Sequence, residues 1–113
     1  MIAVSFTNSP DSITLKMSGH AEAAEAGQDI ICASASILAY TIAQTALYMR
    51  EQGKLRRKPY VKLEKGYAVV TMRPKSDSYE EALHSYFIAE VGFSLLAQSY
   101  PQYVDVQSML GQA

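Results

Sequence analysis

Two stretches near the start of the chain, residues 2–7 and 13–18, alternate between apolar and polar positions. A period of two is typical of a β-strand with one buried face. The segment NSPDS between the two stretches is rich in turn-forming residues. We therefore predict a β-hairpin here, and a second hairpin from residues 60–65 and 67–73 around a Lys-Gly turn.

A helix is predicted from about Asp29 to Gln52, because apolar residues recur there at steps of three and four. Asp29 is the expected N-cap, and Gly53 is the expected stop. The expected buried stripe comprises Ile31, Ala35, Leu38, Ile42, Ala46 and Met49.

A second helix is predicted to begin at Ser78, where Glu81 follows three residues later in the spacing of a capping box. Pro101 is expected to terminate it. The buried row that we predict for this helix is Leu83, Phe87, Val91 and Leu95.

The order of these elements is ββαββα, with a possible short C-terminal strand around residues 103–106. This order predicts an α+β fold: a small, mostly antiparallel sheet packed with two helices, in a single domain over residues 1–113. Residues 30–49 carry no charge and are long enough to span a bilayer, but several polar side chains dilute them. We interpret them as a helix buried on two sides, which predicts a homodimer and no membrane span.

Composition limits the classes of function. The chain has 113 residues, 49% hydrophobic, with a net charge of −1, which indicates a globular domain and no general attraction to nucleic acid or anionic membranes. Its single cysteine, Cys32, cannot form an intrachain disulfide. The first residues lack the pattern of a secretory signal. We expect a cytoplasmic location, where thiols stay reduced.

Candidate chemistry gathers between residues 19 and 36. A loop over residues 20–28, without strong periodicity and with Gly19 and Gly27 as possible hinges, joins the second strand to the first helix. His20 follows the strand and Cys32 lies in the first turn of the helix, so both are expected at one rim of the domain. A helix N-terminus and a nearby imidazolium both favour a thiolate, the reactive form of cysteine.

Two structural alternatives accompany this nucleophile–base interpretation. Cys32 is also compatible with a buried structural thiol, which spacing alone favours, because cysteine is among the residues most often buried. A metal site would need more ligands than one His, one Cys and one Asp, so we expect neither metal nor cofactor. Asp29 could cap the helix or orient the imidazole, and Ser36, four residues after Cys32, could donate a hydrogen bond to the thiolate or to a substrate oxygen.

The residues Gly19-His20-Ala21, Gly27, Asp29-Ile30, Cys32-Ala33 and Ser36 resemble the signature of the bacterial ribosomal-processing cysteine proteases, called Prp. The spacing from His20 to Cys32 agrees with that signature, and the length and order of elements fit nearly the whole chain.

The resemblance implies a homodimeric Cys–His protease with Cys32 as nucleophile and His20 as base and later general acid. Asp29 and Ser36 match further motif positions and would have supporting roles. The implied substrate is the N-terminal extension of a large-subunit ribosomal protein, number twenty-seven in the standard naming, cut after a pair of aromatic residues during ribosome assembly.

A noncatalytic ribosome- or RNA-associated binding module is the alternative. The basic segment KLRRKPYVK carries it, because cations beside an aromatic ring can hold phosphates and stack a base. The same segment is also compatible with a solvated connector after a helix C-terminus, where positive charge is favoured. We prefer the connector and expect no direct binding of nucleic acid. His84 is expected at the surface or in an interface, and Tyr40, Tyr48 and Tyr86 in core or dimer packing.

Overall fold

The computed structural model describes residues 1–19 and 27–111, and for residues 27–29 the backbone alone. Its elements follow the predicted order and end in a fifth strand. They are β1 (Ile2–Ser9), β2 (Ser12–Gly19), α1 (Gly27–Glu51), β3 (Tyr60–Glu64), β4 (Tyr67–Met72), a short 3₁₀ helix (Ser76–Ser78), α2 (Tyr79–Ser99) and β5 (Val104–Ser108).

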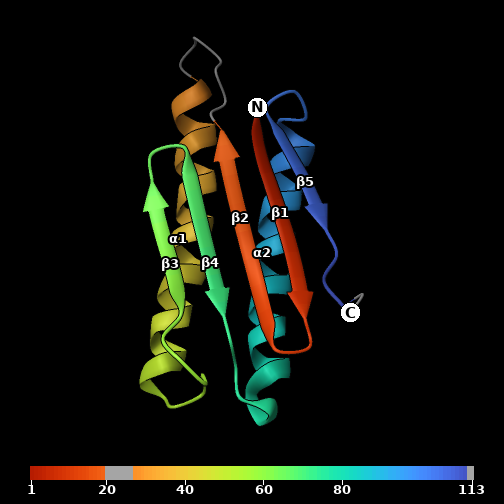
Figure 1. Cartoon of the computed structure of the whole chain (residues 1–113). Coiled ribbons are helices and arrows are strands. Elements are labelled where there is room, and N and C mark those ends of the chain that lie inside the picture. The colour runs from red at the N-terminus through yellow and green to blue at the C-terminus, as the bar shows by residue number, and fades with distance from the viewer. Residues whose placement is uncertain (20–26, 112–113) are drawn as a thin grey trace.

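The strands form one five-stranded sheet in the order β3-β4-β2-β1-β5. All neighbours are antiparallel except β1 and β5, which run parallel. Both helices lie against the same face of this sheet (Figure 1), α1 behind β3 and β4 and α2 behind β2 and β1. The α+β fold is therefore confirmed, including the mostly antiparallel sheet and the C-terminal strand.

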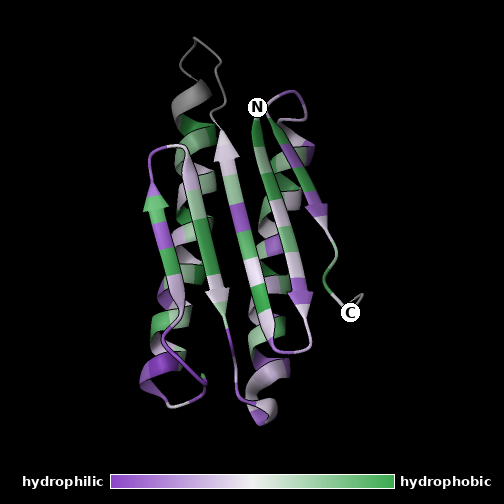
Figure 2. Cartoon of the chain, in the orientation of Figure 1, coloured by the Kyte–Doolittle hydropathy of each residue, from purple (hydrophilic) through white to green (hydrophobic). Residues whose placement is uncertain are grey.

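The core lies between the sheet and the helices, because alternate residues of each strand point to the helix side. Phe6, Ile13 and Leu15 are fully buried there. Phe6 meets Phe93 of α2 edge to face, with ring centroids 5.9 Å apart. The polar residues that alternate with them leave the other face of the sheet open to solvent, and this gives the banded strands of Figure 2.

The buried row predicted for α2 is wrong in part. Leu83 is buried and Phe87 is half-buried, but Val91 and Leu95 are exposed on the outer side of the helix. The buried side chains of this helix are Ala82, Leu83, Tyr86, Ala89, Phe93 and Leu96. The helix is apolar around most of its circumference, so a row spaced by four residues did not identify its buried side. The stripe predicted for α1 is confirmed, with Leu38 half-buried.

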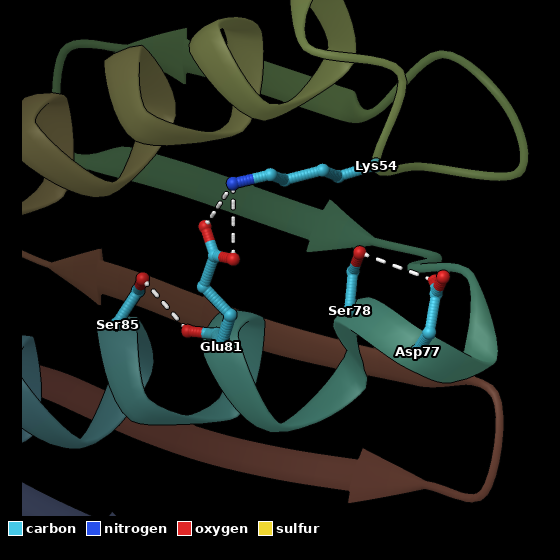
Figure 3. A network of polar contacts seen from close by, with 5 residues as sticks. All are labelled: Lys54, Asp77, Ser78, Glu81 and Ser85. Carbon is cyan, nitrogen blue, oxygen red and sulfur yellow. Dashed lines mark hydrogen bonds and ion pairs between the residues drawn. The ribbon is translucent and has the colours of Figure 1, made fainter.

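The capping box predicted at Ser78 does not form. Ser78 occupies the N-cap position of α2, but its hydroxyl makes no capping hydrogen bond and donates instead to the Asp77 carboxylate at 3.4 Å. The Glu81 carboxylate instead pairs with Lys54: the Lys54 ammonium donates to the two carboxylate oxygens at 2.8 and 3.0 Å (Figure 3). An ion pair between elements thus replaces the local contact.

The Lys54–Glu81 ion pair joins the connector after α1 to the first turn of α2, but we expect it to contribute little stability. Both side chains are partly exposed, 34% and 51%, and such pairs contribute about 0.2–1 kcal/mol. A double-mutant cycle with Lys54→Met and Glu81→Gln, followed by urea unfolding, should give a coupling energy in that range. The coupling should shrink in 1 M salt. A coupling above about 2 kcal/mol, or one insensitive to salt, would contradict this expectation.

The basic connector is held to the rest of the domain by a second contact. Arg56 donates to the Asp11 carbonyl oxygen at 2.9 Å and lies 3.5 Å from its carboxylate. The Ser9 hydroxyl and then the Arg56 guanidinium lower the pKa of Asp11. With Lys54 and Arg56 both in ion pairs, the structure favours the interpretation of this segment as a connector.

Among the residues that the structure describes, one helix, over Ile30–Glu51, is long and apolar enough to cross a membrane by length and composition, with a mean hydropathy of 1.6. The core helix of a soluble protein meets the same criteria. Here one side of α1 is buried against the sheet, including Ile31, Ala39 and Ile42. Its opposite side leaves Ile30 and Ile37 more than half exposed.

Candidate active site

The fold brings three segments together at one end of the sheet. The end of β2, the turn between β3 and β4, and the start of α1 all lie at the top of Figure 1. Gly19, the last residue of β2, donates its backbone N–H to the carbonyl oxygen of Gly66 in the β3–β4 turn at 2.9 Å. This bond fixes the strand end beside the turn.

Cys32 lies at this end of the molecule, in α1, and is partly exposed. It contacts the core on one side and a pocket of about 460 Å³ on the other, a volume within the range of about 300–1,000 Å³ typical of ligand sites. The pocket is lined by Ile2, Met17, Gly19, Cys32, Ala35, Ser36, Tyr40, Leu63, Glu64, Lys65, Gly66, Tyr67 and Ala68. The cysteine is thus accessible from a concave surface and is not sealed in the core.

One flank of α1 forms a wall of the pocket. Cys32, Ser36 and Tyr40 follow one another at steps of four, so they form a row along the same side of the helix. Ala35, in the adjacent buried row, contributes to the floor. The predicted proximity of Ser36 to Cys32 is consistent with this geometry, since both side chains border the same pocket.

The hydroxyl of Ser36 differs from its neighbours on α1. Ser34 donates to the carbonyl oxygen of Ile30 at 2.7 Å, and Thr41 makes the same bond to Ile37. Within residues 1–19 and 27–111, no hydrogen bond engages the Ser36 hydroxyl. A hydroxyl on the pocket wall that makes no hydrogen bond to its own helix can form one with a molecule bound in the pocket.

The start of α1 differs from the prediction. The helix begins at Gly27, two residues before the expected start, so Asp29 lies inside its first turn and is not the N-cap. Cys32 is consequently in the second turn, one turn further from the free N–H groups than expected. An acidic residue in the first turn is still favoured by the helix dipole.

Of the remaining predicted site residues, the structure describes Gly19 but not His20. His20, and with it residues 20–26 of the predicted loop, are outside the described residues. Gly19 is described and has a φ of +100°. It lines the pocket together with Cys32, and His20 is the next residue in the chain. Among the residues described, no three His, Cys, Asp or Glu side chains gather as a metal-binding group.

A family model described as cysteine protease Prp matches residues 1–105 of this chain. The protein belongs to the cysteine protease Prp family. The family is one of cysteine proteases, so the noncatalytic alternative from the sequence is set aside. No protein among those of curated function is similar enough in sequence to match.

Several solved structures share this fold. An essential ribosomal processing protease Prp from S. aureus, in complex with a substrate peptide, is similar with a TM-score of 0.66 and 21% identity, over 96% of this chain and 99% of that one. SMU.848 from Streptococcus mutans has a TM-score of 0.67 and 20% identity, over 96% and 94%. A hypothetical protein from Staphylococcus aureus has a TM-score of 0.56 and 15% identity, over 96% and 99%. At these identities the likeness shows the fold.

In this Prp-family fold, sequence reasoning missed the far side of the pocket. Tyr40 was expected in core or dimer packing; it is 51% exposed, so it does not lie in the core, and it lines the pocket. Leu63 of β3, for which no role was predicted from the sequence, also lines the pocket and is 39% exposed. The available signal was the four-residue spacing of Tyr40 from Ser36 and Cys32. Tyr86, in contrast, is buried and donates to the Val70 carbonyl oxygen at 2.9 Å, as core packing requires.

Proposed function

We propose that this protein removes the N-terminal extension of a large-subunit ribosomal protein, number twenty-seven, by cleaving after a pair of aromatic residues in the reducing cytoplasm. The observation that carries the proposal is the position of Cys32 on the wall of a pocket large enough for peptide side chains. Membership of the cysteine protease Prp family supports it. So does a structure of the same fold, which is described as a ribosomal processing protease with a substrate peptide.

In the proposed reaction, the Cys32 sulfur attacks the carbonyl carbon of the scissile peptide bond, and its proton passes to the His20 imidazole. The tetrahedral intermediate collapses when His20 gives this proton to the departing amine, which leaves a thioester on Cys32. His20 then takes a proton from water, whose oxygen attacks the thioester, and the acid product leaves as the thiol is restored. No metal or redox partner is required to balance these steps.

Ser36 and Asp29 have supporting roles in this proposal. The Ser36 hydroxyl, free of bonds to its own helix among the described residues, donates to the thiolate or to the substrate oxygen. Asp29 orients the imidazole of His20, a role that a carboxylate commonly plays for a catalytic histidine. Gly19 and Gly27 are the proposed hinges for the loop that carries His20.

The test is incubation of the purified protein, under reducing conditions, with the ribosomal protein bearing its N-terminal extension. Mass spectrometry of the product should show one cut after the aromatic pair. A substrate in which both aromatic residues are replaced by aspartate serves as the control and should remain intact. An uncut native substrate, or cuts spread along the extension, would refute the proposal.

We also propose a homodimer, on the evidence of the outer sides of α1 and α2. A helix patch of Ile37, Ile88, Val91 and Leu95 is 57–64% exposed although each residue is large and apolar. Large apolar side chains exposed on the outer sides of helices are typical of surfaces that contact another protein. A second copy covers the patch if the two helix layers face each other across a twofold axis.

Ile88→Asp should convert this dimer to a monomer, because a carboxylate in an apolar interface is costly to desolvate. Light scattering coupled to size exclusion measures the mass directly. Tyr60→Asp is the matched control, since Tyr60 is also about half exposed but lies on β3, away from the helix patch. A monomeric native protein would disprove the proposal, and so would a dimer that survives in the Ile88→Asp variant.

A further inference from the structure

The pocket beside Cys32 exists because α1 does not cover the edge of the sheet. Leu63 of β3 pairs with Ala68 of β4, and paired residues share a face, so both point to the helix side. Ala68 is 2% exposed, whereas Leu63 is 39% exposed. The helix layer therefore shields β4 but leaves the helix-side surface of the edge strand β3 partly open.

Small residues deepen this gap. Ala35 on α1 and Ala68 on β4, both almost fully buried, form parts of the floor where larger side chains would fill the space. Gly66, in the adjoining turn, adds no side chain. The result is a groove between α1 and β3, with β4 beneath it.

The two upper walls of the groove are apolar. Tyr40 extends from α1 and is 51% exposed, and Leu63 lines the same pocket from β3. Both expose apolar surface that folding alone does not bury. The charged lining residues are Glu64, the last residue of β3, and Lys65, the first residue of the β3–β4 turn. An apolar, partly aromatic channel favours a large apolar side chain, and aromatic side chains above all, because ring–ring contacts add to the burial of area.

The spacing of Tyr40 from Cys32 along α1 places the groove close to the peptide bond that Cys32 would attack. Eight residues of helix separate Tyr40 from Cys32, which is about 12 Å along the axis at about 1.5 Å per residue. Long side chains of a helix point back toward its N-terminus, so the ring of Tyr40 covers the turn of Ser36. An extended peptide advances about 3.3 Å per residue, which puts the ring about two to three residues from the bond at Cys32.

We propose that Tyr40 and Leu63 form the subsite that binds an aromatic side chain of the substrate within three residues of the scissile bond, and thereby determine specificity. This inference rests on the proposed peptidase function of Cys32. In this subsite the substrate ring lies between the tyrosine ring and the leucine side chain, over the alanine floor. Tyr40 and Leu63 bind the substrate and take no part in bond making.

The experiment compares kcat/KM for two peptides, one with the aromatic pair and one with alanines in its place. Tyr40→Ala should lower the ratio of these values about tenfold or more, because the truncated wall no longer contacts the aromatic side chain of the substrate. Leu63→Ala should lower it in the same direction. Tyr40→Phe should keep the native ratio, because the ring and not the hydroxyl forms the wall.

Two controls match these variants in residue type and exposure. Tyr60 is 52% exposed and Leu47 is 41% exposed, and neither lines the pocket. Tyr60→Ala and Leu47→Ala should leave the ratio unchanged. A ratio that stays native in Tyr40→Ala, or that falls equally in Tyr60→Ala, overturns the inference while the proposed function stands.

A binding measurement separates the inference from the proposed reaction. Fluorescence anisotropy of the labelled aromatic peptide, on proteins that all carry Cys32→Ala, reports affinity without cleavage. Adding Tyr40→Ala should weaken binding about tenfold, and adding Tyr60→Ala should not. If the native protein binds this peptide with that dependence but does not cleave it, the proposed function fails and the subsite remains. If it neither binds nor cleaves the peptide, both are wrong.

Discussion

Cys32→Ala is expected to abolish cleavage and leave the fold intact. We expect kcat/KM to fall by about a thousandfold or more, since removing the nucleophile leaves only substrate binding to favour the reaction. The side chain is partly exposed at the pocket, so loss of one sulfur atom should change the free energy of unfolding by less than about 1 kcal/mol. Single-turnover assays and thermal unfolding measure the two effects.

His20→Ala tests whether the two residues act as one unit. The single variants should be about equally inactive, and the double variant should be no worse than either, because members of a catalytic pair are strongly non-additive. Ser34→Ala is the matched control on α1, since the Ser34 hydroxyl bonds to its own helix and Ser34 does not line the pocket. Cleavage that survives in Cys32→Ala would mean that the reaction does not use this thiol.

The architecture could be predicted from the sequence because each strand buries one face. Alternation in residues 2–7 and 13–18 gave the first hairpin, and the register of Val4 with Met17 and of Phe6 with Leu15 places the apolar residues together on the helix side. The short strand near residue 104 also formed, parallel to β1. A period of two leaves little ambiguity about which side faces the core.

Helix faces were harder to predict. In α2, Ile88, Val91 and Leu95 are as apolar as the buried Phe93, so composition alone could not separate the side that packs on the sheet from the outer side. At Ser78, a long-range partner, Lys54, took the carboxylate that local spacing had assigned to the cap. Both errors arise where tertiary contacts decide between locally equivalent arrangements.

The candidate site was predictable in its chemistry but not in its shape. Cys32 and Ser36 could be placed on one side of a helix from their spacing. The pocket is also lined by Leu63 and Ala68 from the second hairpin. Nothing in the local sequence indicates that α1 leaves the side chains of β3 partly uncovered. Pockets between elements depend on packing distances, which periodicity does not contain.

Of the two glycines that line the pocket, Gly19 and Gly66, we expect Gly19→Ala to reduce stability more. Gly19 has a φ of +100°, which costs a residue with a side chain about 1–2 kcal/mol. An added Cβ would also overlap the backbone carbonyl oxygen of Met1, at the start of the neighbouring strand. Backbone cannot move aside as a flexible side chain can, so the end of β1 or β2 must shift.

Gly53→Ala separates the two causes. Gly53 has a φ of +73°, but a Cβ there would meet nothing within 4 Å, so its substitution should cost about 1 kcal/mol from conformation alone. We expect Gly19→Ala to cost about 3 kcal/mol or more in denaturant unfolding and to impair cleavage in the molecules that remain folded. The second effect follows because Gly19 lines the pocket and immediately precedes His20. Equal losses of stability in the two variants would contradict this prediction. They would show that the backbone at Met1 can shift away from residue 19 without a measurable change in the free energy of unfolding.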